Sequence, residues 1–233
     1  MDSSEDAVAY VRNSIRNYIL NGEYGPRSRL VEADICEEFG VSRFIARIAL
    51  RELASERLVV VQRNKGARVR ALSIEEAIEI TEVRIELEGL IARFAAERVQ
   101  EDQALQLANT GTLMEKAVAD GDVLRYGDLN LRLHSLLQEI AGHATASRIL
   151  DELYAQFATQ QLRVALQPGR SSASLPEHQA IIAAVIGGNS EAAAEAMTRH
   201  LQSVIEALKQ MPADATHWPP RGESGTQPDG VEF

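Results

Sequence analysis

The stretch that decides the fold of the first third of the chain is EADICEEFGVSRFIARIALRELASE, residues 32–56. Gly40 is placed to end a short helix over 32–39, because glycine readily adopts the left-handed conformation of a helix end. Ser42 is a good N-cap for a second helix over 43–56. Two helices joined by a tight turn that holds a glycine have helix-turn-helix spacing.

Elements on both sides of this segment extend it into a winged helix-turn-helix. Apolar side chains recur every three or four residues over 4–21, which predicts one more helix in front. Behind it, LVVVQ at 58–62 and ARVR at 67–70 predict two short strands. The connection RNKG at 63–66 predicts a β-hairpin with a basic tip.

Charge is distributed unevenly along the 233 residues. The formal net charge of −10 argues against nucleic acid as a partner of the whole surface. However, residues 1–72 hold 12 Lys and Arg against 10 Asp and Glu, whereas residues 73–233 hold 12 against 24. Such asymmetry suggests a small DNA-facing module joined to an acidic body, although a solvated basic face would look the same.

The helix over 43–56 offers a surface suited to DNA. Arg43 and Arg47 are four residues apart and share a face, while Leu50 and Leu53 lie toward the other side. Arginine can bond guanine O6 and N7 with two hydrogen bonds or pair with phosphate. The alternative is a surface helix with scattered arginines.

These residues resemble the DNA-binding domain of GntR-type bacterial transcription regulators. The matching pieces are IRNYILNGEYGPRSRL (15–30), VEADICEEFGVSR (31–43), ARIALRELASERLV (46–59) and NKGARVR (64–70). Phe44, Ile45 and Ile48 depart from the family pattern in the recognition helix. The resemblance implies a double-stranded DNA operator, contacted by Ser42, Arg43, Arg47, Arg63, Asn64, Lys65 and Gly66.

The remainder of the chain reads as an all-α antiparallel bundle. The helical pattern of apolar residues runs from Ser73 to Met211, and glycine- or proline-containing turns divide it into six helices. The first of these helices begins with a capping box at Ser73. After that first helix, further helices are expected near 101–119, 123–141, 145–166, 174–187 and 189–210. We therefore expect a mainly α protein with three segments: a winged helix over 1–72, a bundle over 73–211 and a disordered tail over 212–233.

Histidines are the most informative residues of the bundle. Asn130 and His134 are four residues apart on one helix, and His178 and His200 lie on the two last helices. Bundle metal sites are built from side chains of facing helices, and imidazole suits zinc, nickel, cobalt or iron. Each histidine alone is more often a surface or hydrogen-bonded residue, and we expect that role for His143.

Residues 75–210 resemble the FCD effector-binding domain of the FadR subfamily of GntR regulators, with six helices as in its VanR-like branch. The pieces are EVRIELEGLIARFAAER (82–98), NLRLHSLLQEIAG (130–142) and EHQAIIAAVIGGNSEAAAEAMTRHL (177–201). The resemblance implies a divalent metal, zinc or nickel, at Asn130, His134, His178 and His200. It also places Arg84 at the effector pocket. A divalent ion held by three neutral imidazoles and a neutral Asn130 keeps its charge, so we expect the effector to be a small anionic metabolite, a carboxylate, that Arg84 also binds. The alternative for Arg84 is an ion pair with Glu88 on the helix surface.

Other features narrow the class of protein. The single cysteine, Cys36, excludes an intrachain disulfide framework and fits a reducing cytoplasm. The chain shows neither a membrane-spanning run nor a signal peptide, and it lacks a phosphate-binding loop and a nucleophile elbow. We therefore expect a cytoplasmic, homodimeric, metabolite-responsive regulator of a palindromic operator and not an enzyme. A metalloenzyme with a three-histidine site, and a DNA-binding scaffold whose bundle only dimerises, remain as alternatives.

Overall fold

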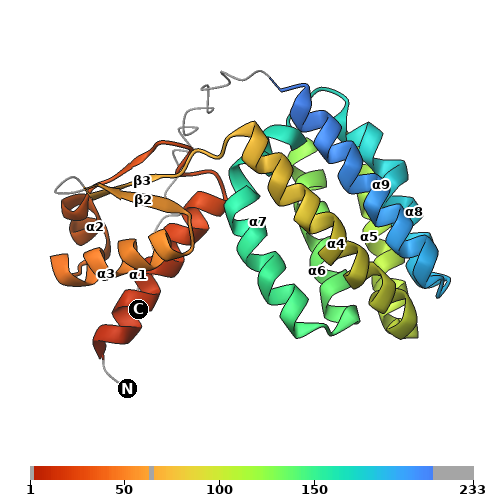
Figure 1. The fold of residues 1–233 in the computed structure, drawn as a ribbon, viewed down its shortest axis with the longest axis horizontal. Helices are drawn as coiled ribbons and strands as arrows, with labels where there is room; N and C mark the ends of the chain where they lie inside the picture. The colour runs from red at the N-terminus through yellow and green to blue at the C-terminus, as the bar shows by residue number, and fades with distance from the viewer. Residues whose placement is uncertain (1–2, 63–65, 212–233) are drawn as a thin grey trace, which may run out of the picture.

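The computed structural model describes residues 3–62 and 66–211, which form a winged helix beside a helical bundle (Figure 1). The winged helix comprises α1 (Ser3–Leu20), β1 (Arg29–Leu30), α2 (Glu32–Phe39), α3 (Arg43–Ser55), β2 (Val59–Gln62) and β3 (Gly66–Val69). The bundle comprises α4 (Ile74–Arg98), α5 (Glu101–Ala119), α6 (Val123–Ala141), α7 (Ala144–Ala165), α8 (Arg170–Ile186) and α9 (Ser190–Lys209). The expected fold class, mainly α with a small β element, is confirmed.

The helix-turn-helix forms as its sequence dictates. Gly40 ends α2 with a φ of 64°, in the left-handed region, and its N–H donates to the carbonyl of Cys36. Ser42 caps α3, and its hydroxyl accepts from the Ile45 N–H at 3.4 Å. The buried side of α3 consists of Ala46, Ala49, Leu50 and Leu53.

The wing differs from the expected two-stranded hairpin. It is a three-stranded antiparallel sheet in the order β1-β3-β2, because the two-residue strand β1 pairs with β3. A strand this short carries no alternation of apolar and polar residues, so the sequence pattern does not reveal it. The tip of the wing, Arg63, Asn64 and Lys65, lies outside the described residues.

Gly66 is the residue that this third strand requires. Its φ is 78°, and a Cβ built there would lie 2.2 Å from the carbonyl oxygen of Leu30. The wing therefore admits no side chain at this position. The role of Gly66 that the geometry shows is to let β1 approach β3.

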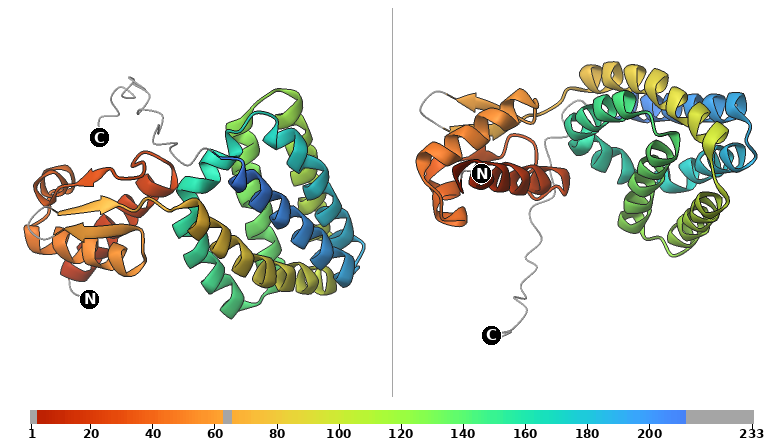
Figure 2. Two further views of the ribbon diagram at one scale, coloured as in Figure 1. Left: turned by 45° about the horizontal axis from the view of Figure 1, so that its top comes forward. Right: turned by 90° about the horizontal axis from the view of Figure 1, so that it is seen from below.

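The two parts of the molecule meet along α1 and α7. α7 lies on the side of the bundle that faces the winged helix, and α1 contacts it (Figures 1 and 2). Ala155 of α7 is buried in the apolar cluster of the winged helix, which also contains Val11 and Ile15 of α1. The bundle thus contributes one residue to the core of the other part.

Within the bundle, α4 packs along α9, and the two run side by side in Figure 1. Ser73 caps α4 by accepting from the Glu76 N–H at 3.1 Å, but the Glu76 carboxylate pairs with Arg70 instead of completing a capping box. Among the described residues, no helix is long and apolar enough to cross a membrane. The expected tail over 212–233, with Trp218 and His217, is outside the described residues.

The start of α8 corrects the sequence analysis. A helix was expected from residue 174 with Pro176 in its first turn, but α8 begins at Arg170 after Gly169, whose φ is 77°. Pro176 therefore lies inside the helix, where it cannot donate to the carbonyl four residues earlier. Ser174 is buried in the helix instead of capping it. The four added residues bring Arg170 to the bundle interior.

We expect Gly66→Ala to unfold more easily than Gly40→Ala. Both glycines have positive φ, but a Cβ at Gly40 meets nothing within 4 Å, whereas one at Gly66 meets backbone. Gly40→Ala should cost about 1–2 kcal/mol for the left-handed conformation alone, and Gly66→Ala more. Urea denaturation followed by circular dichroism measures both. Equal losses would contradict the close approach of β1.

Candidate functional site

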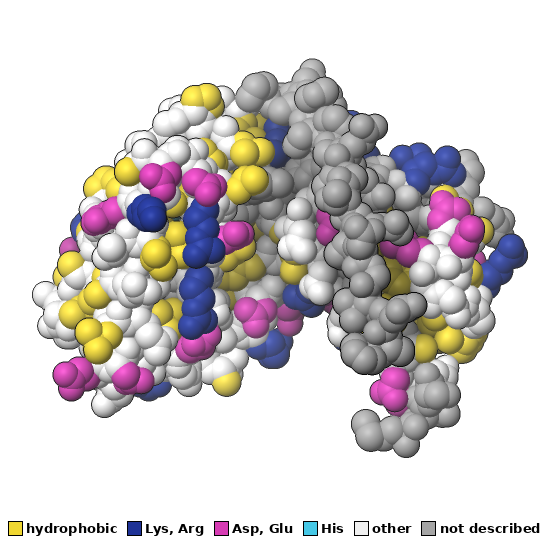
Figure 3. Space-filling model, turned by 180° about the vertical axis from the view of Figure 1, so that it is seen from behind, with side chains coloured by type: hydrophobic (Ala, Val, Ile, Leu, Met, Phe, Trp, Pro, Cys, Tyr) yellow, Lys and Arg dark blue, Asp and Glu magenta, His cyan; other side chains and the backbone are white. Residues whose placement is uncertain are grey.

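The first candidate site is the exposed side of α3. Arg43, Arg47 and Arg51 are exposed at spacings of four residues along the helix. Together with Arg29 of β1 they border a hollow of about 620 Å³ between α3 and the sheet. In Figure 3, Lys and Arg side chains lie at the outer edge of the winged helix, away from the bundle. The predicted contacts Arg43 and Arg47 therefore share one basic surface.

Arg47 is held by a carboxylate of the neighbouring helix. Its Nε and Nη2 donate to Glu32 Oε1 and Oε2 at 3.2 and 2.9 Å. These hydrogen bonds, with the charge of Arg47, lower the pKa of Glu32. A phosphate or guanine that binds Arg47 must replace this carboxylate.

Other residues of the predicted DNA-binding surface lie on or near α3. Ser42 is exposed at the start of α3, beside Arg43. Phe44, which departs from the family pattern, is 67% exposed on the same turn. Arg29 and Arg51 were not singled out by the sequence analysis. Spacing from Arg47 could have identified Arg51, but only the pairing of β1 brings Arg29 to this surface.

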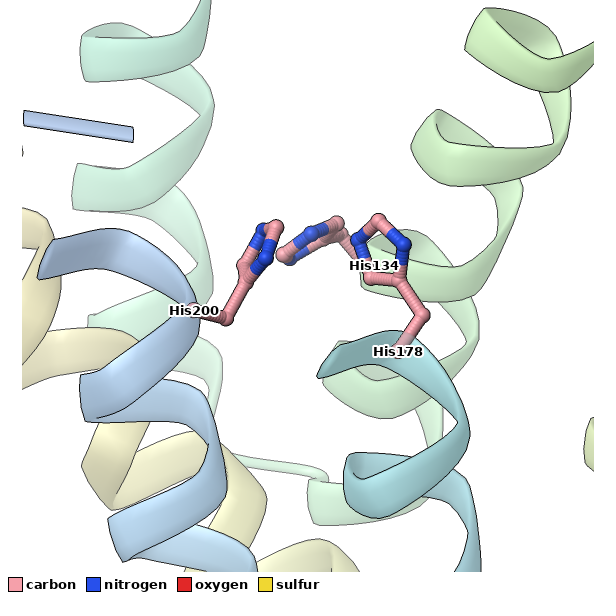
Figure 4. A group of neighbouring side chains, drawn as sticks. All are labelled: His134, His178 and His200. Atoms are coloured by element: carbon pink, nitrogen blue, oxygen red, sulfur yellow. The ribbon is translucent and has the colours of Figure 1, made fainter. Parts of the chain in front are cut away.

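The second candidate site is a group of three buried histidines inside the bundle. His134 comes from α6, His178 from α8 and His200 from α9, and their rings converge between these helices (Figure 4). Each ring offers one nitrogen such that the three nitrogens lie within 4.8 Å of one another. The ring centroids of His178 and His200 are 4.3 Å apart. The sequence placed these residues on three separate helices, and the fold brings them together.

A polar side chain faces Nδ1 of each histidine on the outside of the group, and the contacts of His178 and His200 are hydrogen bonds. His134 Nδ1 lies 2.6 Å from Glu88 Oε2, and His200 Nδ1 lies 2.9 Å from Glu177 Oε2. His178 Nδ1 is 2.8 Å from the hydroxyl of Tyr126. An imidazole that donates Nδ1–H outward presents an unprotonated Nε2 on its other side.

Two polar atoms at the centre have no hydrogen-bond partner among the described residues. They are His178 Nε2 and Asn130 Oδ1, and both are buried; His134 Nδ1 and Glu88 Oε2, at the edge of the group, also lack a hydrogen bond although they face each other. Burial, followed by the charge of neighbouring imidazoles, holds the pKa values of His178 and His200 well below the usual range. These two imidazoles are therefore neutral near pH 7, which is the form that binds a metal ion.

Beside the histidines lies a buried ion pair. Arg84 Nε donates to Glu88 Oε1 at 2.8 Å, and the residues are 4% and 2% exposed. Burial alone would raise the pKa of Glu88, but the charges of Arg84 and His134 lower it. Arg84 also lies over the rings of Tyr154 and Phe157, at 4.5 and 5.0 Å. The alternative that Arg84 pairs with Glu88 on the helix surface is therefore wrong about the surface, because this ion pair is buried in the core.

A small cavity of about 70 Å³ joins these groups. It is lined by Arg84, Asn130 and all three histidines, and by Arg170, which the sequence analysis missed. Arg170 Nη1 donates to Ser203 Oγ at 2.7 Å, and its Nη2 is 3.5 Å from Glu177. It was missed because residue 170 was expected in a loop. Glu88 and Glu177 were missed as histidine partners, although Glu177 precedes His178 directly.

His143 lies apart from this cavity. Its Nδ1 accepts from the Ala146 N–H at 3.2 Å at the start of α7, and its ring packs near Phe94. The structural role expected of His143 agrees with this place.

Comparison with known proteins connects both sites to one family. The model of the "Bacterial regulatory proteins, gntR family" matches residues 8–69, and the FCD domain model matches residues 79–203. Among curated relatives is the uncharacterized HTH-type transcriptional regulator YdhC of Bacillus subtilis, 26% identical over 85% of this chain and 89% of that protein. Another is the galactonate operon transcriptional repressor of Escherichia coli, 27% identical over 83% and 93%.

A solved structure with the same fold is E. coli McbR/YncC, with a TM-score of 0.76 and 20% identity over 90% of this chain and 99% of that one. The relatives are transcription regulators and not enzymes, which confirms that expectation. The chain belongs to the GntR family of bacterial regulatory proteins, and it carries an FCD domain behind its winged helix.

Proposed function

We propose that this GntR-family regulator binds a palindromic operator as a homodimer and responds to a small carboxylate at a metal ion in its bundle. The proposed DNA-binding domain spans 1–72, and the metal- and effector-binding domain spans 73–211. The observation that carries the proposal is the group of three buried imidazoles that converge in one small cavity. Repression as the direction of control is supported by the name of the E. coli galactonate operon relative.

The residues around the cavity fit a divalent transition metal. His134, His178 and His200 would bind it through Nε2, and Asn130 would add an amide oxygen. Zinc and nickel suit such nitrogen-rich sites. The two orphaned polar atoms, which a dry core would leave unsatisfied at a cost of about 1–3 kcal/mol each, support the same assignment.

The charges in the cavity support an anion as effector. A metal ion bound by three imidazoles and an amide would keep its positive charge and attract a carboxylate. Arg84 lines the same cavity and is the proposed clamp for the effector, although it is already paired with Glu88. Arg170 supplies a second guanidinium close by. Galactonate, the name carried by the E. coli relative, is itself a carboxylate.

DNA binding should depend on Arg43 and Arg47. We expect Arg43→Ala and Arg47→Ala each to cost about 1–3 kcal/mol of operator affinity and to relax its sequence preference. Fluorescence anisotropy on a duplex selected from a random library by the purified protein measures this. Arg199→Ala is the control, because Arg199 is exposed on α9 and pairs only locally with Glu195. Two unchanged affinities would reject the assigned surface.

The wing should act differently from α3. Replacing Arg63 and Lys65 by alanine should weaken binding to all duplexes alike and reduce its salt dependence, because backbone contacts carry no base preference. Asn64 and Gly66 belong to the same proposed contact. A change in sequence preference would instead place this segment on base edges.

Metal content should be about one ion per chain, as expected for a single three-histidine site. His134→Ala, His178→Ala and His200→Ala should each lose it or hold it weakly, while His143→Ala should keep it. Elemental analysis after dialysis compares the four variants. Equal content in all four would refute the site, and metal-free wild-type protein that still regulates would favour a scaffold that only dimerises.

Acid should destabilise the metal-free protein. The folded-state pKa values of His178 and His200 are lowered, so the unfolded chain binds more protons below its own histidine pKa of about 6.5. Stability is therefore fully present above that pH and is lost as the pH falls toward 5.5. Urea denaturation between pH 7.5 and 5.5 should show this slope, and His178→Gln should reduce it. A flat profile in the wild type would disprove neutral burial.

Thermal stability should rise with a suitable small carboxylate. Lactate, succinate and galactonate are the first probes, each measured with and without a chelator by differential scanning fluorimetry. We expect the stabilising effect to vanish with the metal and to shrink in Arg84→Lys, which keeps the charge facing Glu88 but loses the planar fork. An effect that survives complete metal removal would show that the metal is not the anchor.

A further inference from the structure

Two hollows of the molecule share a wall. The histidine cavity, of about 70 Å³, and a groove of about 620 Å³ are both lined by Gly127, Gln161 and Ala165. The groove lies between α1 of the winged helix and helices α6 and α7 of the bundle. The wall between the two hollows is thus made by one turn of α6 and the end of α7.

Gly127 leaves space beside this wall. It lies inside α6, where glycine is less favourable than alanine, and a Cβ built there meets nothing within 4 Å. Packing therefore does not explain the glycine, and the space beside it is open. Any larger side chain at this position would fill part of the space that borders both hollows.

The groove is mainly apolar and partly uncovered. Leu124 and Leu131 of α6 and Leu166 are 65%, 50% and 46% exposed, and all three line it. Leu20 of α1 forms part of the opposite wall. A hydrophobic surface of this kind gains stability when an apolar group covers it.

The volumes of the two hollows suit different parts of a ligand. Small-molecule sites commonly have volumes of about 300–1,000 Å³. The histidine cavity is far smaller than this and suits an anionic head group alone. The groove has the volume that the cavity lacks, and it opens from the same wall.

We propose that the effector is a carboxylate with an extended, largely apolar tail, which passes Gly127 and lies in the groove against α1. This inference rests on the proposed metal-anchored carboxylate site and specifies its ligand. Arg16, Asp128 and Asp151 also line the groove, and their charged side chains would meet a polar group at the far end of the tail. One ligand would then contact the bundle and the DNA-binding half at once.

Tyr154 of the groove packs against two residues that line the histidine cavity. Its ring lines the groove, lies under the guanidinium of Arg84 and is 6.1 Å from the ring of His134. A tail in the groove would therefore contact the side chain that packs against Arg84 and His134.

The test is the chain-length dependence of carboxylate binding to zinc-loaded, full-length protein. Isothermal titration calorimetry with acetate, hexanoate and octanoate should show affinity rising by up to about fourfold per added methylene in the wild type. Gly127→Leu and Leu20→Ser should each reduce this gain at least severalfold, with zinc content as the check on folding. Ala108→Leu is the matched control, because it adds the same side chain on an exposed part of α5.

The outcomes separate this inference from the function on which it rests. If zinc and acetate bind but chain length brings no gain in affinity, or if both groove variants show the same gain as the wild type, the groove is not part of the site. Octanoate binding that persists after zinc removal would also overturn the proposal, since the head would not be anchored. If neither zinc nor acetate binds the wild type, the proposed function itself fails.

Discussion

The buried pair of Arg84 and Glu88 is the interaction on which the interior of the bundle depends. An isolated charge in such a core would cost several kcal/mol, and removing one partner of a buried pair typically costs about 3–5 kcal/mol. The second oxygen of Glu88 lies 2.6 Å from His134 Nδ1, so the pair also stands directly beside one imidazole of the histidine group. The Glu88 carboxylate therefore belongs both to the buried ion pair and to the surroundings of the candidate metal site.

This arrangement explains why a helical bundle contains so many polar side chains at its centre. Glu88, Tyr126 and Glu177 each face one histidine, and these partners come from α4, α6 and α8. Every imidazole thereby faces a polar group of a helix other than its own. A shift of any one helix would turn a ring away from the other two, so the group reports on the packing of the whole bundle.

Much of this could be predicted from the sequence, and the exceptions have physical reasons. Capping residues such as Ser42 and Ser73 locate helix starts because their effect is local. The histidines could be placed on facing helices by periodicity and resemblance. The early start of α8 could not, because Pro176 reads as a first-turn residue unless tertiary contacts override it. For the same reason Arg170 was expected in a loop and was not recognised as a residue of the cavity.

Contacts between segments that are far apart in the sequence could not be predicted either. β1 exists only through its pairing with β3, and the partnership of Glu88 with His134 joins residues 46 positions apart. No local pattern encodes such distances. The same holds for the groove, whose walls come from α1, α6 and α7.

Ala155 shows that the boundary between the two halves in sequence is not their boundary in space. A residue of α7 completes the core beneath α1, so a cut after residue 72 leaves an apolar surface uncovered on the winged helix. A chimera that transplants residues 1–72 onto another bundle would inherit this gap unless the recipient offers a small side chain at the same place. Exchange of DNA-binding modules between such regulators is thus constrained by one position in the recipient's bundle.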